Sequence, residues 1–315
     1  MTNTVIQIIN STKDLIPSIS KYKSGLENKF NHLDKINQEL LSENINYVTF
    51  EDPLYPQILL EDETNPALLF YKGDINLLNY RSLAIVGSRV MDDYAISLLH
   101  EVISRTKTPI ISGLALGVDI TAHNIAVDKG LKCIAVLPSG LLSKVIYPKK
   151  NQRYVNSILD GGGILVSQYL PSFEPKPYSF LIRNKIIVNL SNSVWVVKAS
   201  LNSGSISTGK YAIEKNKKVI TSIHRLDSED YKGCIQLINL GALALTDVDV
   251  FGEKENSVAF EGNESLIIKL IGEGVNTLDS LSEHIEYYEL IELLELLDDK
   301  RAISQVDGLY IILGI

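Results

Sequence analysis

Residues 83–89 read Leu-Ala-Ile-Val-Gly-Ser-Arg, and after a helical run residues 109–123 read Pro-Ile-Ile-Ser-Gly-Leu-Ala-Leu-Gly-Val-Asp-Ile-Thr-Ala-His. In both stretches a short apolar run leads directly into glycine and then into a helix. This is the pattern of a buried parallel strand that ends in a turn suited to phosphate. Because ligands of parallel sheets bind at the carboxyl ends of the strands, we expect the functional residues at these turns.

The same alternation of strand and helix continues along the chain. It predicts strands near 83–87, 109–112, 132–137, 163–167, 194–198 and 218–222. Helices are expected over 92–105, 119–129, 151–159, 180–190, 207–216 and 233–240. This order is typical of an α/β fold, here an extended Rossmann-like, mostly parallel sheet with helices on both faces.

The regions outside this core suggest four segments. We expect a small N-terminal helical subdomain over 1–50, the Rossmann-like core over 51–251, and a polar linker over 252–261. Residues 262–315 show the pattern of three short helices and a β-hairpin with a two-residue turn, which indicates a winged-helix domain. The expected helices of this domain are Ser265–Ile271, Leu278–Ile285 and Tyr287–Leu297.

The third helix of the expected winged-helix domain is strongly acidic. Carboxylates repel phosphate, so this helix is unsuited to reading DNA, and we predict a role in protein contact or dimerisation. The residues concerned are Glu286, Glu289, Glu292, Glu295, Asp298 and Asp299.

Composition is that of an ordinary globular protein, with 45% hydrophobic and 22% charged residues among 315. No stretch approaches 18 uncharged apolar residues, and the N-terminus lacks a signal-peptide pattern, so no membrane contact is expected. Cys133 and Cys234 lie far apart in sequence and are interpreted as reduced core thiols, which favours a cytoplasmic location.

Charge is distributed unevenly along the chain. Residues 1–80 carry 6 basic and 11 acidic residues, residues 81–250 carry 20 and 13, and residues 251–315 carry 4 and 14. The net charges are therefore −5, +7 and −10. A basic middle segment between acidic ends favours a polyanionic partner for the core.

The first candidate anion site lies in the two opening turns. Glycine allows close approach of the backbone, serine can donate a hydrogen bond, and arginine presents a planar fork to phosphate. Asp119 is placed to cap the helix that follows, and His123 is interpreted as a packed residue rather than a catalyst. The candidates here are Gly87, Ser88, Arg89, Ser112, Gly113 and Gly117.

Further candidates follow the later strands, at basic positions or at small polar residues near a helix N-terminus. Arg183 and Lys185 are equally consistent with surface charge, and the loop around Lys149 with a solvated turn. The candidates are Lys149, Arg183, Asn184, Lys185, Lys198, Ser203, Gly204, Ser205 and Lys210.

Several enzyme signatures are missing from the sequence. There is no G-x-G-x-x-G fingerprint, no Walker A lysine motif, and no Ser-His-Asp or Cys-His arrangement. We therefore expect no catalytic residues, no metal and no cofactor, and a protein that is not an enzyme.

The ordered set of motifs resembles the DNA-processing protein A (DprA/Smf) family, as a divergent member. The similarity extends over roughly residues 50–245 and is carried by Tyr55-Pro56, 87–89, 112–123, Tyr147-Pro-x-x-Asn151, Arg183-Asn184, 203–205 and Gly241-Ala242. The resemblance implies an extended Rossmann fold that binds single-stranded DNA and loads a RecA-type recombinase onto it during natural transformation. It also implies a homodimer, and a contact between Arg89 and a DNA phosphate in a pocket lined by neighbouring lysines.

The chain departs from the usual family pattern at several places. Leu116 stands where the family typically has arginine, Gln168 and Lys198 where it has glutamate, and Lys185 where it has arginine. Ser222-Ile223 replaces a Pro-Gly pair after the sixth strand. The resemblance therefore implies a rearranged pocket.

Two functional hypotheses follow. The first is a non-enzymatic, single-stranded-DNA-binding recombination mediator, with salt-sensitive and largely sequence-independent binding. The second is a Rossmann-like nucleotide sensor or an enzyme similar to the cytokinin-activating phosphoribohydrolases. Residues 202–208 lack the double glycine and the carboxylate of that enzyme family, so the first hypothesis is favoured.

Overall fold

The chain forms two compact units, residues 1–251 and residues 252–315. The computed structural model describes residues 3–26, 33–247, 263–272, 275–299, 303–306 and 309–312. The linker expected over 252–261 lies outside the described residues. Within the described ranges, no helix is long and apolar enough to cross a membrane.

A nine-stranded sheet organises the first unit, in the order β1-β2-β6-β5-β4-β3-β7-β8-β9. All neighbours from β6 to β9 pair in parallel, whereas β1 and β2 pair antiparallel with each other and β2 pairs antiparallel with β6. The strands are β1 Asn46–Thr49, β2 Leu68–Gly73, β3 Leu83–Val86, β4 Ile110–Ser112, β5 Cys133–Val136, β6 Ile164–Ser167, β7 Ser193–Val196, β8 Lys218–Thr221 and β9 Leu243–Ala244. The predicted α/β class and its six strands are confirmed.

The strand order reverses between β3 and β7. From β3 the chain proceeds through β4, β5 and β6 on one side, then returns to β7 and β8 on the other. In open α/β sheets the crevice at such a reversal, outside the carboxyl ends of the strands, is the usual place for a ligand. The loop after β3 therefore lies at the position where the topology favours binding.

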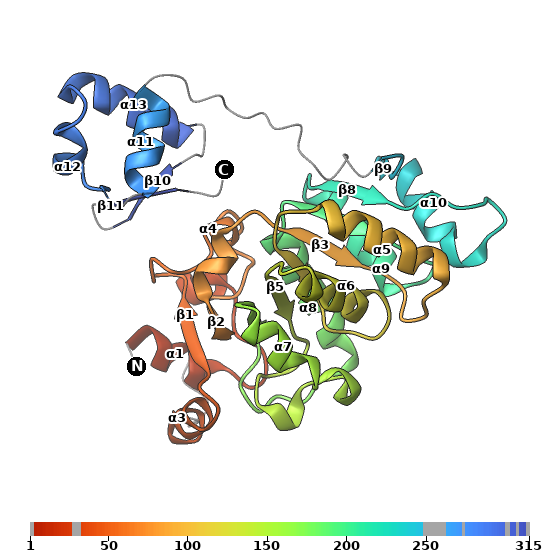
Figure 1. Cartoon of the computed structure of the whole chain (residues 1–315). Coiled ribbons are helices and arrows are strands. Elements are labelled where there is room, and N and C mark those ends of the chain that lie inside the picture. The colour runs from red at the N-terminus through yellow and green to blue at the C-terminus, as the bar shows by residue number, and fades with distance from the viewer. Residues whose placement is uncertain are drawn as a thin grey trace. The chain divides into compact units, whose positions relative to one another are not determined.

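Helices cover both faces of the sheet (Figure 1). Side chains of β3 alternate between two cores: Leu83 and Ile85 belong to one, Ala84 and Val86 to the other, as the two-residue period of a strand requires. Burial on both faces explains the uninterrupted apolar runs in the sequence. The helices are α4 Gln57–Leu60, α5 Asp93–Arg105, α6 Val118–Asp128, α7 Tyr154–Asp160, α8 Pro177–Leu190, α9 Gly204–Glu214 and α10 Lys232–Asn239.

The N-terminal segment contains the short helices expected from its sequence. They are α1 Asn3–Ser11, α2 Ile19–Lys23 and α3 Leu33–Ser42. Their apolar residues, among them Ile8 of α1 and Ile36 of α3, belong to the same core cluster as Leu83 and Ile85 of β3. Residues 1–50 and the sheet thus share one core and form one compact unit.

The second unit contains α11 Asn263–Gly272, α12 Leu278–Ser282, α13 Tyr287–Asp299 and a hairpin of β10 Ile303–Val306 with β11 Leu309–Ile312. Val306 pairs with Leu309, so two residues connect the strands, as expected. Leu281, Leu290 and Ile303 lie in its core, which is separate from the two cores of the sheet. The interpretation of this unit as a winged helix stays a prediction.

Candidate nucleic-acid interface

The loop after β3 is locked against the start of α6. The Ser88 amide donates to the Lys198 carbonyl (2.8 Å), and the Ser88 carbonyl accepts from the Val118 amide (3.1 Å). Gly117 has a φ of +76°, and a Cβ there would lie 2.3 Å from the Ser88 carbonyl oxygen. A Cβ on Gly87 would lie 2.5 Å from Val118. Both glycines therefore permit a close contact that leaves Arg89 exposed at the carboxyl edge of the sheet.

Arg89 forms one wall of a small pocket of about 260 Å³. Its guanidinium lies 5.5 Å from the centre of the Phe180 ring, and Phe180 meets the Tyr147 ring edge-on at 5.7 Å. Tyr147 is 42% exposed. The pocket is further lined by Gly113, Ala115, Leu116 and Pro148. A cation beside accessible aromatic rings can contact a phosphate and a base at the same time.

The β4–α6 loop beneath this pocket is held at three points. Nη1 of Arg183 donates to the carbonyls of Gly113 and Val136, the latter at 2.8 Å. A carboxylate oxygen of Asp119 accepts from the Gly113 amide at 3.1 Å. Nδ2 of Asn151 donates to the Leu114 carbonyl at 2.9 Å. Asp119 therefore holds the loop, and Gly117 rather than Asp119 occupies the N-cap position of α6.

Arg183 is buried, which corrects its predicted role as a phosphate ligand. A Cβ on Gly113 would lie only 2.2 Å from Nη1, so glycine is required for the guanidinium to pack there. Burial lowers the pKa of Arg183 to about 10, opposed by the nearby carboxylate of Asp119. Burial also raises the pKa of Asp119, opposed by the charge of Arg183. The pair is structural, because its groups point into the protein and not toward solvent.

Ser112 and His123 are buried in the same region and are not part of an exposed surface. The Ser112 hydroxyl donates to the Ile85 carbonyl at 2.6 Å and so links β4 to β3. Neither ring nitrogen of His123 has a hydrogen-bond partner of normal geometry among the described residues. Burial lowers the pKa of His123 to about 4, although the nearby Ser112 backbone favours the charged form slightly. His123 is thus a packed residue, as the sequence predicts.

Lys198 is also unavailable to a phosphate. Its ammonium group lies 2.8 Å from Asp92 and 3.0 Å from Asp230, and its side chain is 3% exposed. Burial alone would lower the pKa of Lys198, but hydrogen bonds to the two carboxylates outweigh it and raise the pKa. The expected cationic site at the end of β7 is therefore an ion-pair cluster with two partly exposed carboxylates.

The remaining candidates lie on α8 and α9. Asn184 accepts from Nε of Arg183 (2.9 Å) and donates to the Thr208 hydroxyl (2.9 Å), so it links the two helices. Lys185 is exposed, and its ammonium group lies over the Tyr211 ring at 5.4 Å. The hydroxyl of Ser203 caps α9 by accepting from the Ile206 amide. Gly204 is exposed, and Ser205 and Lys210 are half-buried in the first turns of α9.

Lys149 and its neighbour Lys150 are exposed beside the pocket, directly after Pro148. Phe180 and Tyr147 line the pocket, although no pattern in the sequence singles them out as its walls. Tyr169, another aromatic residue of this region, is not accessible to a base, because it is buried against Phe173 with ring centres 4.4 Å apart. The accessible groups at and beside the pocket are thus Arg89, Tyr147, Phe180, Lys149 and Lys150.

Comparison with known proteins places these features in a family. The family model of DNA recombination-mediator protein A matches residues 46–255. The chain belongs to this family. The DNA processing protein DprA of Streptococcus pneumoniae is 36% identical over 207 residues, which cover 65% of this chain and 72% of that protein. Protein Smf of Escherichia coli is 35% identical over 207 residues, which cover 65% of this chain and 55% of that protein.

Solved structures of the family agree with the fold. The crystal structure of DprA from Streptococcus pneumoniae has a TM-score of 0.66 and 29% identity, covering 79% of this chain and 96% of that one. A structure of DprA from Helicobacter pylori, described as showing a single-stranded DNA binding mode, has a TM-score of 0.58 and 30% identity. It covers 65% of this chain and 94% of that one. The chain is therefore a DNA-processing protein with the fold of the DNA recombination-mediator protein A family.

We predict that Arg183→Met lowers the free energy of unfolding by about 3–5 kcal/mol, because it leaves Asp119 buried without its charge partner. Lys185→Met on the same helix removes an exposed cation and should cost about 1 kcal/mol or less. Urea unfolding monitored by the fluorescence of Trp195 measures both, since this single tryptophan is buried in β7. Equal stability of the two variants would contradict the structural role of Arg183.

A second prediction concerns pH. The folded protein binds the proton of His123 only below a pKa of about 4, whereas the unfolded chain binds it near 6.5. Stability is therefore lost as the pH falls from 7 to 5, and the contribution of one such histidine is about 2 kcal/mol. His123→Leu should remove this part of the pH dependence, while substitution of the exposed His100 by glutamine should retain it. Identical pH profiles for wild type and His123→Leu would refute the assignment.

Proposed function

We propose that the chain is a single-stranded-DNA-binding recombination mediator whose bound strand crosses the carboxyl edge of the sheet at Arg89. One observation carries the proposal: the exposed guanidinium of Arg89 lies over Phe180 beside the accessible ring of Tyr147. A phosphate held by Arg89 brings its bases within reach of these rings. Stacking on aromatic rings tolerates any base, so binding is expected to be largely independent of sequence.

The charge of the edge supports a single strand rather than a small nucleotide. Lys149 and Lys150 are exposed in the segment that follows Tyr147-Pro148, so cations extend beyond the pocket along one direction. The pocket itself is small and open to solvent, so it holds only part of a ligand. A polymer can contact the pocket and extend along the exposed lysines beside it.

The biological role is proposed on the strength of family membership. We infer that the protein coats single-stranded DNA as a homodimer and transfers it to a RecA-type recombinase, with no catalytic step of its own. Natural transformation is the process in which this would occur. The Helicobacter pylori relative, described as binding single-stranded DNA, lends support to the DNA-binding part of this proposal.

The central test is charge reversal at Arg89. Arg89→Glu should weaken binding to oligodeoxythymidine and to mixed-sequence oligomers alike, by about tenfold or more at low salt, because one phosphate contact becomes repulsive. Lys107→Glu is the matched control, since Lys107 is exposed at the opposite edge of the sheet, before β4. Fluorescence anisotropy over a salt series measures how steeply the logarithm of the binding constant falls with the logarithm of the salt concentration. This slope should be shallower for Arg89→Glu than for wild type, and unchanged for Lys107→Glu. An unchanged affinity at low salt would remove Arg89 from the site.

A second measurement separates the proposal from a nucleotide-processing enzyme. Incubation of the protein with nucleoside monophosphates should release no free base. Release of base at a rate proportional to protein concentration, and lost in Arg89→Glu, would instead favour a phosphoribohydrolase-like activity.

A further inference from the structure

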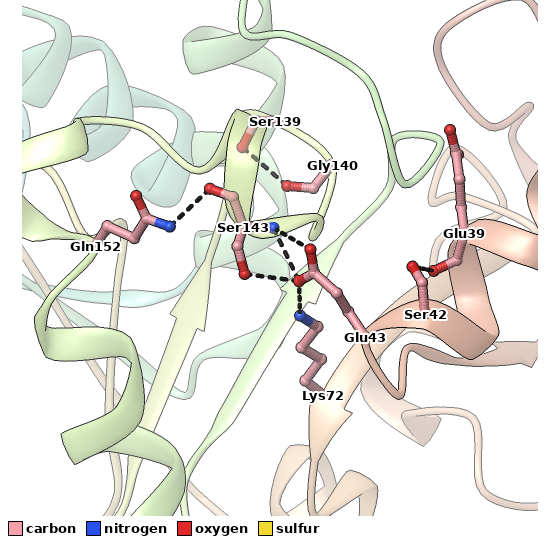
Figure 2. Close-up of polar contacts among 8 residues, drawn as sticks. All are labelled: Glu39, Ser42, Glu43, Lys72, Ser139, Gly140, Ser143 and Gln152. Carbon is pink, nitrogen blue, oxygen red and sulfur yellow. Dashed lines mark hydrogen bonds and ion pairs between the residues drawn. The ribbon is translucent and has the colours of Figure 1, made fainter.

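Glu43, which directly follows α3, binds the loop around Ser143, which is distant in sequence. Its two carboxylate oxygens share the single Ser143 amide N–H, at N···O distances of 3.0 and 2.9 Å, and one of them also accepts from the Ser143 hydroxyl at 2.6 Å. The ammonium group of Lys72 in β2 lies 2.7 Å from the same carboxylate. Figure 2 shows Ser143 and Lys72 both contacting the Glu43 carboxylate, so three separate segments of the chain meet at this point. Charge-assisted hydrogen bonds of this kind are stronger than those between neutral groups.

Ser143 is held from its other side as well. Nε2 of Gln152 donates to the Ser143 carbonyl at 2.8 Å (Figure 2). Ser143 and Gln152 therefore close a segment of ten residues, and Glu43 ties the start of that segment to the N-terminal helices. The far end is tied to the β4–α6 loop through Asn151 and the Leu114 carbonyl.

The closed segment contains one whole wall of the binding pocket. Tyr147 and Pro148 line the pocket, and the exposed cations Lys149 and Lys150 follow at once. Of the groups that hold this segment, Asn151 acts from within the core and is buried. Glu43 acts from outside the parallel part of the sheet, and its carboxylate reaches the segment only because α3 ends beside it. The N-terminal region is thereby coupled to the pocket.

We propose that Glu43 is a positioning residue of the DNA-binding pocket, and that it holds residues 143–152 so that Tyr147, Lys149 and Lys150 meet the strand bound at Arg89. The inference rests on the proposed function. It assigns to the N-terminal segment a part in DNA binding that its charge alone would not provide, because residues 1–50 carry five basic and five acidic residues.

The sign of the effect makes the inference testable. Glu43→Ala removes a negative charge, so electrostatics alone would strengthen binding to DNA. Positioning predicts the opposite: a loss of about tenfold in affinity for oligodeoxythymidine, the size expected when one or two stacking or phosphate contacts are misplaced. Glu63→Ala is the matched control, because it also removes one carboxylate, which pairs with Lys23 of α2. The control should bind DNA as well as wild type or slightly better.

Two further readouts distinguish positioning from a general loss of stability. Amide hydrogen exchange in residues 143–152 should become faster in Glu43→Ala, while exchange in β3 and β7 stays as in wild type. Lys149→Ala combined with Lys150→Ala should weaken binding in wild type but have little further effect in Glu43→Ala, since the lysines are then already displaced. Glu43→Gln, which keeps an acceptor for the Ser143 hydroxyl, should recover part of the affinity.

The outcomes separate the inference from the proposed function. If Arg89→Glu weakens DNA binding but Glu43→Ala binds with wild-type or higher affinity, the positioning role is wrong and the site at Arg89 stands. If neither variant changes binding, the proposed site itself is wrong. A further outcome would also overturn the positioning role: Glu43→Ala lowers the affinity, but the two lysine substitutions still weaken binding in that variant as much as in wild type.

Discussion

The buried guanidinium of Arg183 is the contact on which the binding edge depends. It joins the carbonyls of Gly113 and Val136, at the ends of β4 and β5, and lies beside the buried carboxylate of Asp119. The loop that it holds contains Leu114 with a φ of +55° and Gly117 with a φ of +76°. A non-glycine residue in the left-handed region costs about 1–3 kcal/mol and persists only where its surroundings enforce it. Arg183 and Asp119 supply that enforcement.

The loop that Arg183 holds shapes the pocket beside Arg89. The pinned loop supplies Ala115 and Leu116 to the pocket, and Gly117 allows it to pack on the backbone of Ser88 and Arg89. Arg89 is thereby left at the surface, over Phe180, instead of folding into the interior. At the end of β7, by contrast, Asp92 and Asp230 neutralise Lys198 and leave carboxylate surface exposed. The accessible positive charge lies toward Tyr147 and Lys149, so a bound strand should follow that direction.

Much of the fold could be predicted from the sequence, because the strands are buried on both faces. Leu83–Val86 and Cys133–Val136 are uninterrupted apolar runs, which are typical of strands in a parallel sheet covered on both faces. The site was harder to predict. The sequence does not show whether a basic side chain is exposed to solvent or buried beside a carboxylate. Arg183 and Lys198 were therefore expected to bind phosphate. Phe180 was missed because its role depends on Arg89, 91 residues away, and no local pattern reports that contact.

Photocrosslinking of oligodeoxythymidine to the intact protein, followed by peptide mapping, tests the proposed binding edge most directly. We predict crosslinks in the peptides that contain Tyr147 and Phe180, and the loss of these crosslinks in Arg89→Glu. Crosslinks confined to α13, or to the α9 N-terminus around Ser203, with none at Tyr147 or Phe180, would contradict it.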